Sequence, residues 1–510
     1  MDKRVRVRFA PSPTGGLHLG GVRTALFNYL FAKKHQGDFL LRIEDTDQSR
    51  FVHGAEEYIF ETLRWCGIEP DESAVHGGPH GPYRQSERKS SYRQYAEQLV
   101  RAGKAYYAFE LPEELETMRG RFKTADNPSP QYDHRIRMNM RNSCSLTLEE
   151  TERLLDDDAP HVIRIKMPEN ETVVISDLIR GEVSFHTGLI DDKVLLKADG
   201  MPTYHLAVVV DDFFMKISHA FRGEEWLPSA PVHVLLWRYL FGEENMPQWA
   251  HLPLILKPDG NGKLSKRDGD RLGFPVFAMD WKDPNSGETI KGFRERGFLP
   301  EAFINMLALL GWNDGTGKEI FSLNELIDAF SMERVHKAGA KFDYEKAKWF
   351  NHEWIRQMPV SAYKDVVKEI FVTNGVGIND EARFEKILSL VKDRCTLLND
   401  FYDESRFFFE PPTQWDIESV KPKWNPDKKN FFESFVSQVE SISSFDPVSI
   451  ESNFKQLAGE KNIKPGELQL PFRIMLVGEK KGPPVFEIAG LLGKTDTINR
   501  IRHFLDAISV

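Results

Sequence analysis

Cysteine is scarce in this chain of 510 residues. The sequence has 3 cysteines, Cys66, Cys144 and Cys395, which lie far apart and form no Cys-x-x-Cys pair. This spacing excludes a fold that depends on a framework of disulfides. Unpaired cysteines are typical of a reducing compartment, so we expect a cytoplasmic protein.

Long apolar runs and a basic charge balance are missing as well. No stretch approaches the roughly 18 apolar residues of a membrane-spanning helix, and the first residues lead directly into a strand pattern, so we expect neither a membrane partner nor a secretory signal. The net charge is −10, which counts against binding nucleic acid over the whole surface. In a large protein, however, a local patch decides such binding.

The remaining composition is that of an ordinary globular protein. Hydrophobic residues make up 41% and charged residues 28% of the chain, as in folded soluble domains. This length predicts roughly two to four domains with ample buried core. The sequence contains no internal repeat and no low-complexity tract.

The most distinctive stretch is residues 11–21, Pro-Ser-Pro-Thr-Gly-Gly-Leu-His-Leu-Gly-Gly. Before it, residues 4–9 alternate between charged and apolar side chains, which predicts a strand. After it, apolar residues spaced three and four apart over residues 22–35 predict a helix that Gly37 closes. A glycine-rich loop between a strand and a helix directs backbone N–H groups at an anion, most often a phosphate.

This loop differs from the common phosphate-binding motifs. It lacks the Lys-Ser/Thr ending of a Walker loop, and it does not match the Gly-x-Gly-x-x-Gly dinucleotide fingerprint. Without a lysine, another side chain must handle phosphate charge, and His18 is the candidate. The alternative is a plain turn between a strand and a helix, but the density of proline, glycine and histidine favours the phosphate site.

A second strand is predicted over residues 39–43, parallel to the first. It leads into Glu44, Asp45, Thr46 and Asp47. Open α/β sheets place ligand contacts at the carboxyl ends of parallel strands, so Glu44 is a candidate binding residue. Asp45 and Asp47 fit the same role, although a helix start capped by Asp47 or Thr46 explains this pair well.

A basic segment follows much later, Lys263-Leu264-Ser265-Lys266-Arg267, with glycines on both sides. The glycines predict a mobile loop that carries three cations. Such a segment alone is more often a solvated turn. Its place after the histidine loop and the Glu44 segment, in that order, favours a second group of cations for the same phosphates.

These three segments together resemble a known family. Residues 11–20 are similar to the first signature of class I aminoacyl-tRNA synthetases, in its glutamyl form, and residues 42–47 and 263–267 resemble the next blocks of that family. The resemblance is strong to about residue 354 and looser beyond. It implies an α/β fold, in which a Rossmann-like parallel-sheet catalytic domain with an inserted α+β acceptor-binding module precedes an all-α anticodon-binding domain.

The resemblance and the changes of pattern along the chain suggest four parts. We expect the catalytic domain at 1–105 and 201–250, the inserted module at 106–200, the lysine loop with a stem-contact region at 251–330, and the anticodon-binding domain at 331–510. Some relatives hold a structural zinc on clustered cysteines of the inserted module. This chain has only Cys144 there, so no zinc is expected.

The implied reaction has two steps. The glutamate carboxylate attacks the α-phosphorus of ATP to give glutamyl-adenylate and diphosphate, and the 2′-hydroxyl of the terminal tRNA adenosine then takes the acyl group. Neither step needs a protein nucleophile, so catalysis consists of positioning and charge stabilisation. Mg²⁺ would accompany ATP without a dedicated protein cage. The implied catalytic residues are Thr14, His18, Lys263 and Lys266, and the further ATP-binding residues are Pro11, Gly15, Gly20, Gly21, Glu225, Leu264, Ser265 and Arg267.

A substrate with two carboxylates calls for two planar guanidinium cations and one anion for the ammonium group. Arg8, Arg222 and Glu44 supply this set, each at the end of a predicted strand. By resemblance, Arg8 meets the side-chain carboxylate, Arg222 the main-chain carboxylate and Glu44 the ammonium. Ser12 and Tyr204 complete the pocket, with Tyr204 at the head of a buried strand predicted from the apolar run at 206–210.

Several alternatives remain at this point. The helical tail, the insert or the lysine loop disfavours each of three alternatives: a nucleotidylyltransferase of the same fold, a shortened relative that charges a modified tRNA base, and a catalytically silent RNA-binding protein. Within the main hypothesis, the protein is a monomer whose partners are ATP, L-glutamate and tRNA(Glu). The resemblance places an arginine against the third anticodon base, and Arg394 is the candidate. Charging of tRNA(Gln) as well stays open.

Overall fold

The computed structural model describes residues 4–125, 127–284 and 286–508, and it leaves the side chains of Lys266, Arg267 and Asp270 undescribed. The chain divides into two compact units. The first comprises residues 1–295 and 300–344, and the second comprises residues 296–299 and 345–510. The expected start of the anticodon-binding domain, residue 331, lies before this division.

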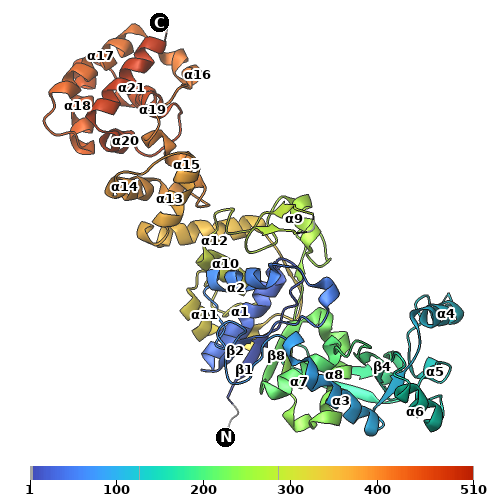
Figure 1. Cartoon of the computed structure of the whole chain (residues 1–510). Helices are drawn as coiled ribbons and strands as arrows, with labels where there is room; N and C mark the ends of the chain where they lie inside the picture. The colour runs from blue at the N-terminus through green and yellow to red at the C-terminus, as the bar shows by residue number, and fades with distance from the viewer. Residues whose placement is uncertain (1–3, 126, 285, 509–510) are drawn as a thin grey trace. The chain divides into compact units, whose positions relative to one another are not determined.

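A parallel sheet forms the centre of the first unit (Figure 1). β1 (Arg6–Phe9) pairs in parallel with β2 (Asp38–Leu41), and α1 (Leu19–Lys34) connects the two strands. β8 (His219–Gly223) packs beside β1, with a backbone hydrogen bond from Ser218, the residue before β8, to the Arg6 carbonyl, and it pairs in parallel with β9 (Gln248–Leu252). The predicted parallel sheet is confirmed.

More residues of β1 are buried than the alternating sequence pattern predicts. All four of its residues are buried, the two arginines included. Arg6 Nη1 forms ion pairs with Asp38 Oδ2 at 2.7 Å and with Glu72 Oε1 at 2.8 Å. Buried guanidinium groups are tolerated only where carboxylates compensate them. β1 is therefore covered on both faces.

Gly37, predicted to close the first helix, bonds the last turn of α1 but does not itself adopt the left-handed conformation. α1 ends at Lys34, and it is Gln36 that has a positive φ, of 51°. Gly37 donates its N–H to the Ala32 carbonyl at 2.8 Å. A Cβ at Gly37 would lie 2.2 Å from the Val5 carbonyl oxygen, so this glycine permits the close approach of the chain to the residues before β1.

The strand predicted from the apolar run at 206–210 is also wrong, because this run lies in a helix. α7 (Tyr204–Phe214) packs against α3 (Lys89–Arg101), α8 (Ala230–Leu240) and β7 (Val194–Leu196). A helix surrounded on several sides has apolar residues at every position, and periodicity alone cannot distinguish it from a buried strand. The β-branched valines favoured the wrong alternative.

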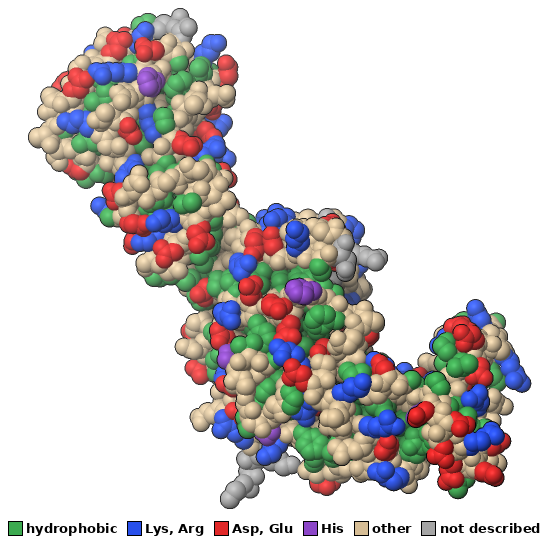
Figure 2. Space-filling model, viewed as in Figure 1, with side chains coloured by type: hydrophobic (Ala, Val, Ile, Leu, Met, Phe, Trp, Pro, Cys, Tyr) green, Lys and Arg blue, Asp and Glu red, His purple; other side chains and the backbone are tan. Residues whose placement is uncertain are grey.

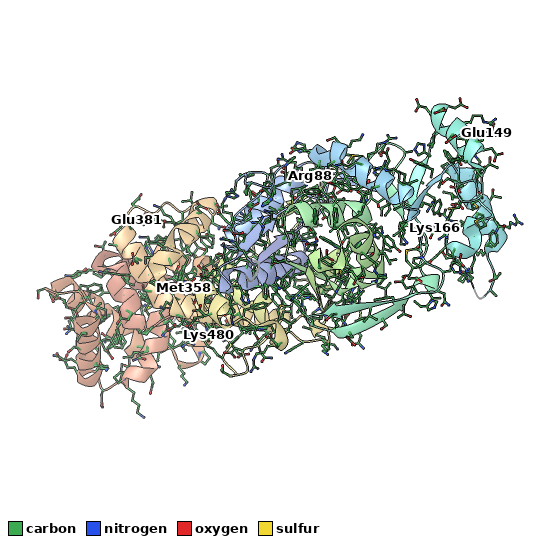
Figure 3. The ribbon with its side chains drawn as sticks, turned by 90° about the horizontal axis from the view of Figure 1, so that it is seen from below. Arg88, Glu149, Lys166, Met358, Glu381 and Lys480 are labelled. Atoms are coloured by element: carbon green, nitrogen blue, oxygen red, sulfur yellow. The ribbon has the colours of Figure 1, made fainter. Side chains whose placement is uncertain are left out.

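The segment expected as an inserted module contains a three-stranded antiparallel sheet in the order β3–β4–β7. Helices α4, α5 and α6 gather beyond β4, at one end of this unit (Figure 1). Figure 3 shows Glu149 at that end, away from Arg88. The bounds are β3 (Ala105–Ala108), α4 (Pro112–Phe122), α5 (His134–Arg137), α6 (Leu148–Asp156) and β4 (Val162–Ile165).

Two strands of the same segment belong to the sheet that contains β8 and β9. β5 (Thr172–Asp177) and β6 (Gly181–His186) form an antiparallel pair, and β5 continues in parallel onto β9, so that the sheet order is β6–β5–β9–β8. The expected boundaries at 106 and 200 thus run through a shared sheet, and the division stays a prediction. The other elements of this unit are α2 (Ala55–Trp65), β10 (Ile255–Leu256), α9 (Lys266–Leu272), β11 (Trp281–Lys282), β12 (Thr289–Ile290), α10 (Pro300–Leu309), α11 (Leu323–Ala329) and β13 (Ala340–Lys341).

The second unit is helical throughout its described residues, as predicted (Figure 1). α14 ends at Val391 and α15 begins at Asp400, whose Oδ2 accepts the N–H groups of Thr396 and Leu397 in the connecting segment at 2.8 Å. The unit comprises α12 (Tyr344–Gln357), α13 (Lys364–Thr373), α14 (Glu381–Val391), α15 (Asp400–Ser405), α16 (Ile417–Val420), α17 (Pro426–Ser441), α18 (Pro447–Glu460), α19 (Pro465–Val477), α20 (Val485–Leu492) and α21 (Lys494–Ala507).

The core of the second unit is rich in phenylalanine. Phe431, Phe435, Phe454 and Phe472 are fully buried, and their rings pack edge to face or stacked at centroid distances of 5.0 to 6.0 Å. Such aromatic pairs add to the free energy gained by burying the rings.

On the face seen in Figure 2, acidic and basic side chains are interspersed. Among the described residues, no helix has the length and apolar character of a membrane span.

Candidate active site

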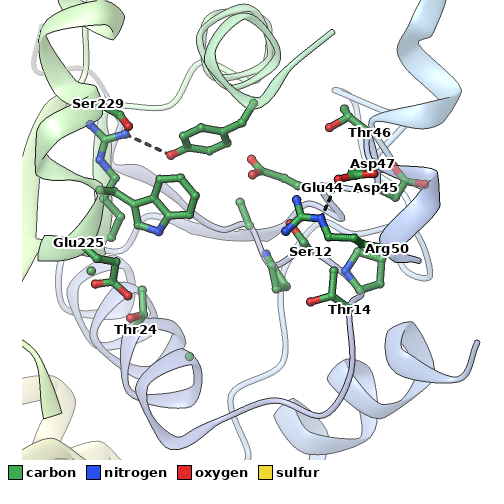
Figure 4. A pocket seen from close by; sticks show the side chains of 18 of the residues that line it. Ser12, Thr14, Thr24, Glu44, Asp45, Thr46, Asp47, Arg50, Glu225 and Ser229 are labelled. Atoms are coloured by element: carbon green, nitrogen blue, oxygen red, sulfur yellow. Dashed lines mark hydrogen bonds and ion pairs between the residues drawn. The ribbon is translucent and has the colours of Figure 1, made fainter. Parts of the chain in front are cut away.

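A cavity of about 1290 Å³ opens at the carboxyl ends of the parallel strands of the first unit. Its walls come from the segments after β1, β2, β8 and β9 and from the N-terminal ends of α1 and α7. Open α/β sheets bind ligands at this edge, because the loops that leave the strands meet there. Figure 4 shows Ser12, Thr14, Glu44 and Glu225 around the cavity.

The cavity brings together most of the residues predicted from the sequence. Gly15 is not among its described lining residues. The side chains of Lys266 and Arg267 lie outside the described part of the chain, and Arg394 belongs to the second unit. The predicted residues that line the cavity are Arg8, Pro11, Ser12, Thr14, His18, Gly20, Gly21, Glu44, Tyr204, Arg222, Glu225, Lys263, Leu264 and Ser265.

His18 stands at the N-cap position of α1, at the positive end of the helix. Its Nδ1 accepts the Gly20 N–H at 3.2 Å, so a neutral ring carries its proton on Nε2. The turn before it is tight, since a Cβ at Gly16 would lie 2.8 Å from the Phe277 ring and 2.9 Å from the Trp281 ring. This position suits an anion, because helix N-termini present N–H groups and a positive dipole.

A line of alternating buried charges runs beneath the cavity. Arg8 Nε lies 3.0 Å from Asp212 Oδ1, and Arg42 Nη1 lies 2.8 Å from the same oxygen. Arg42 Nη2 in turn lies 3.0 Å from Glu44 Oε1. Asp212 thereby holds both arginines, and Arg42 holds Glu44. Neither Arg42 nor Asp212 was predicted from the sequence as a residue of the site. The two aspartates that directly follow the apolar run 206–210 were a signal for Asp212, because a carboxylate beside buried residues requires a partner.

Burial and charge act in opposite directions on these carboxyl groups. Burial raises the pKa of Glu44, and the nearby Arg42 and Arg8 offset this only in part. For Asp212 the burial effect is overcome by Arg8 and Arg42, and its pKa is lowered. Asp212 is therefore a permanent anion, whereas Glu44 gains from a further cation in the cavity.

Arg222 reaches the cavity from the end of β8 and is held by uncharged groups. Its Nε donates to His251 Nε2 at 3.0 Å, and its Nη1 lies 3.2 Å from the Tyr204 hydroxyl and 2.9 Å from His233 Nδ1. The guanidinium also lies 5.0 Å from the centroid of the Trp249 ring. Nη2 is buried without a hydrogen-bond partner. Burying such a donor is costly unless a ligand satisfies it.

The lysine segment, predicted to be a mobile loop, lies between an isolated β-bridge and the start of α9. Lys263 bridges back to Leu256, and its ammonium group forms an ion pair with Glu225 across the mouth of the cavity. The segment then enters α9, whose first turn is capped by Ser265 and Asp268 in a capping box. Lys263 and Glu225 thus face each other where a phosphate could separate them.

Asp45 and Asp47 fix loops in this structure and cap no helix through their side chains. Asp45 accepts the N–H of Ser86 at 2.8 Å and its hydroxyl at 2.5 Å. Asp47 pairs with Arg50 at 2.6 Å at the rim of the cavity. Among the described residues, no group of three or more histidine, cysteine, aspartate or glutamate side chains is arranged to hold a metal ion.

Several buried histidines predict how stability depends on pH. Burial lowers the pKa of His205 and of His219 from 6.5 to about 4, and it also lowers that of His251. The unfolded chain therefore binds more protons than the folded chain between pH 6.5 and 4. The free energy of unfolding consequently decreases as the pH is lowered through this window. Glu44, with its raised pKa, contributes in the opposite direction.

We expect His205 alone to account for a loss of roughly 3 kcal/mol between pH 6.5 and 4. Urea unfolding at several pH values measures how the free energy of unfolding declines. The H219N variant lacks one titrating imidazole, so its decline should be shallower. A free energy of unfolding that stays flat across this window would contradict the burial of these imidazoles.

Two family models match the chain. The model described as "tRNA synthetases class I (E and Q), catalytic domain" matches residues 4–349, and an anticodon binding domain matches residues 345–505. The glutamate–tRNA ligase of Amoebophilus asiaticus is 50% identical over 511 residues, which covers 100% of this chain and 99% of the relative. The enzyme of the same name from Cytophaga hutchinsonii is 50% identical over 509 residues, with 100% and 98% covered.

Solved structures agree with these matches. A glutamate tRNA ligase from Elizabethkingia meningosepticum, in complex with its amino acid, superposes with a TM-score of 0.95 at 48% identity, covering 99% of this chain and 100% of that one. The glutamate-tRNA synthetase of Elizabethkingia anophelis gives a TM-score of 0.92 at 48% identity with the same coverage. With a catalytic and an anticodon-binding domain matched along its full length, the chain belongs to the glutamate–tRNA ligase family of class I aminoacyl-tRNA synthetases.

Proposed function

We propose that the protein joins L-glutamate to tRNA in two steps, formation of glutamyl-adenylate from ATP and transfer to the 2′-hydroxyl of the terminal adenosine. One observation carries the proposal. Two buried guanidinium groups, Arg8 and Arg222, and one buried carboxylate, Glu44, line the same cavity as His18 and Lys263. This set suits a dicarboxylate with an ammonium group beside a polyphosphate.

Three charged side chains of the cavity each bind a different charged group of glutamate. Arg8 binds the side-chain carboxylate and Arg222 binds the main-chain carboxylate, which satisfies its unpartnered Nη2. Glu44 binds the ammonium, and the added cation removes the cost of burying that carboxylate. Ser12 and Tyr204 complete the pocket from opposite walls.

ATP takes the region between α1 and the lysine segment. The N–H groups at the start of α1 and the Nε2 proton of His18 face the phosphates, with Thr14 beside them. Lys263 breaks its ion pair with Glu225 and pairs with the released diphosphate. Lys266 pairs with the diphosphate as well. Mg²⁺ would accompany ATP and neutralise part of the phosphate charge. Carboxylates of the cavity already pair with basic side chains or backbone N–H groups, as Glu44 does with Arg42 and Glu225 with Lys263, which agrees with an ion held mainly by phosphate and water.

The helices and strands of residues 106–200 hold the acceptor end of tRNA, and the second unit holds the anticodon. We further propose that the protein acts as a monomer in the cytoplasm. The unpaired cysteines support the compartment, because the described cysteines are all free thiols, two of them buried.

Arg394 is proposed to read the third anticodon base and so to exclude tRNA(Gln). It forms an ion pair with Glu404 at 2.5 Å and is one-third exposed. Replacing it with Gln should raise charging of tRNA(Gln) relative to tRNA(Glu) by about 10-fold or more, the worth of one charge-assisted hydrogen bond. Charging of both purified tRNAs measures the ratio.

The matched control for this prediction is R502Q, which removes another arginine of the second unit that is paired with a glutamate, Glu440. An unchanged ratio in R394Q would mean that another residue discriminates. A wild-type protein that charges both tRNAs equally would show that it is non-discriminating.

Charging with labelled glutamate, ATP and tRNA(Glu) tests the proposed function itself. Glutamyl-tRNA and AMP should form, and labelled glutamine should give almost none, because its amide cannot accept the two charge-assisted hydrogen bonds that the Arg8 guanidinium offers a carboxylate. Equal charging with both amino acids, or none with either, would refute the assignment.

A further inference from the structure

The two guanidinium groups of the cavity differ in how their charge is balanced. Arg8 lies against a carboxylate, Asp212, at 3.0 Å. Arg222 makes no ion pair with any described residue, and its partners are two imidazoles and a phenol. A buried arginine without a carboxylate is unusual, because an uncompensated charge is costly to bury. Arg222 lines the cavity and its Nη2 has no hydrogen-bond partner, so the carboxylate of a bound ligand can supply the missing anion.

The first imidazole is fixed by a carboxylate behind it. Asp177 Oδ2 accepts both the backbone N–H of His251 at 3.0 Å and its Nδ1–H at 2.6 Å. The Asp177 Oδ1 atom accepts the N–H groups of Ile179 and Arg180 at 2.9 Å. With its proton on Nδ1, His251 presents the lone pair of Nε2 to Arg222. The carboxylate thus orients Arg222 through a neutral ring.

The second imidazole is fixed by the arginine itself. Arginine only donates, so His233 Nδ1 accepts from Arg222 and its proton lies on Nε2. That proton points to His205 Nδ1, 3.2 Å away, and His205 lines the cavity. The chain of bonds joins β5, β9, β8, α8 and α7, so Arg222 is oriented from five elements of the fold.

We propose that His233 and His251 are positioning residues for Arg222, which they hold as an uncompensated cation with Nη2 directed to the main-chain carboxylate of the amino acid. The inference rests on the proposed function, because it takes glutamate as the ligand. A carboxylate in place of either imidazole would neutralise Arg222 in advance. Glutamate would then bring an excess negative charge into the buried cavity.

The surroundings keep both rings neutral. Burial lowers the pKa of His233 well below its usual value, and Arg222 lowers it further. Burial also lowers the pKa of His251, with Asp177 acting in the opposite direction. Protonation of either ring would remove an acceptor and place a second cation beside Arg222, so the neutral forms are the ones that can orient it.

Two substitutions of equal size separate the charge from the packing. In H233N, the amide oxygen can stand where Nδ1 stood and accept from Arg222. In H233D, a carboxylate oxygen accepts from Arg222 in the same place, but its negative charge compensates the charge of Arg222. We expect H233D to raise the KM for glutamate about 10- to 100-fold in diphosphate exchange measured with tRNA present, with the KM for ATP within about twofold of wild type. H233N should keep the glutamate KM within about threefold.

Equal glutamate KM values in H233N and H233D would overturn the proposal, and so would a parallel loss of ATP and glutamate affinity in H233D. If H233D does not fold, H251Q and H251L provide the second comparison. Glutamine keeps an acceptor for Arg222 Nε, so only the leucine variant should lose glutamate, and equal effects would overturn the proposal. A wild-type protein that fails to charge tRNA would instead refute the proposed function.

Discussion

Replacing Arg8 with Gln is expected to raise the KM for glutamate by about 100-fold or more and to leave the KM for ATP within about twofold. A bidentate guanidinium–carboxylate contact contains two charge-assisted hydrogen bonds of roughly 1.5–3 kcal/mol each. The amide of Gln offers one weaker donor and no charge. Arg8 is 3% exposed, so water cannot substitute for the lost contact. Diphosphate exchange at varied glutamate and ATP measures both constants.

The matched control is R6Q, two residues earlier on the same strand. Arg6 is also buried and paired with carboxylates, but it does not line the cavity. This variant should lose stability without a selective loss of glutamate. If R8Q loses ATP and glutamate affinity in equal proportion, Arg8 has a structural role and the assignment of the side-chain carboxylate fails.

Replacing Lys263 with Ala is expected to slow adenylate formation by 10²–10³, the effect of removing one group that stabilises charge in the transition state. The ammonium of Lys263 now pairs with Glu225, so its loss also leaves an acidic side chain facing the phosphates. Rapid-quench measurement of adenylate at saturating substrates isolates this step. The sequence motif predicts a similar effect for K266A.

Lys291 provides the comparison for this prediction. It is exposed to a similar degree and pairs with Asp280 at 2.7 Å, but it does not line the cavity. K291A should form adenylate at the wild-type rate. If K263A does so too, the lysine segment does not take part in the chemistry.

The sequence predicted the part of the site that depends on local pattern. The strand–loop–helix unit around His18 and the segment that leads from β2 to Glu44 are each short stretches of sequence, where periodicity, glycine and proline determine the backbone. Both segments line the cavity. The same local signals placed the apolar run before Asp211 in a strand, because an apolar run does not reveal on how many sides it is covered.

The groups that hold the arginines could not be predicted in this way. Asp177, His233 and His251 lie 56 and 18 residues apart along the chain and meet only because β5, β9 and α8 pack together. Their positions depend on the register of the sheet, and no local pattern specifies it. A histidine within the apolar strand β9 was the available signal, since a buried polar ring requires a partner.

The central claim is that glutamate and ATP occupy one cavity, between the arginines on one side and His18 with Lys263 on the other. A non-hydrolysable sulfamate analogue of glutamyl-adenylate tests this most directly, since it joins both ligands in one molecule. Steady-state inhibition should be competitive against glutamate and against ATP, and binding should be far tighter than for either substrate. Competition with only one of the two substrates would contradict a shared cavity.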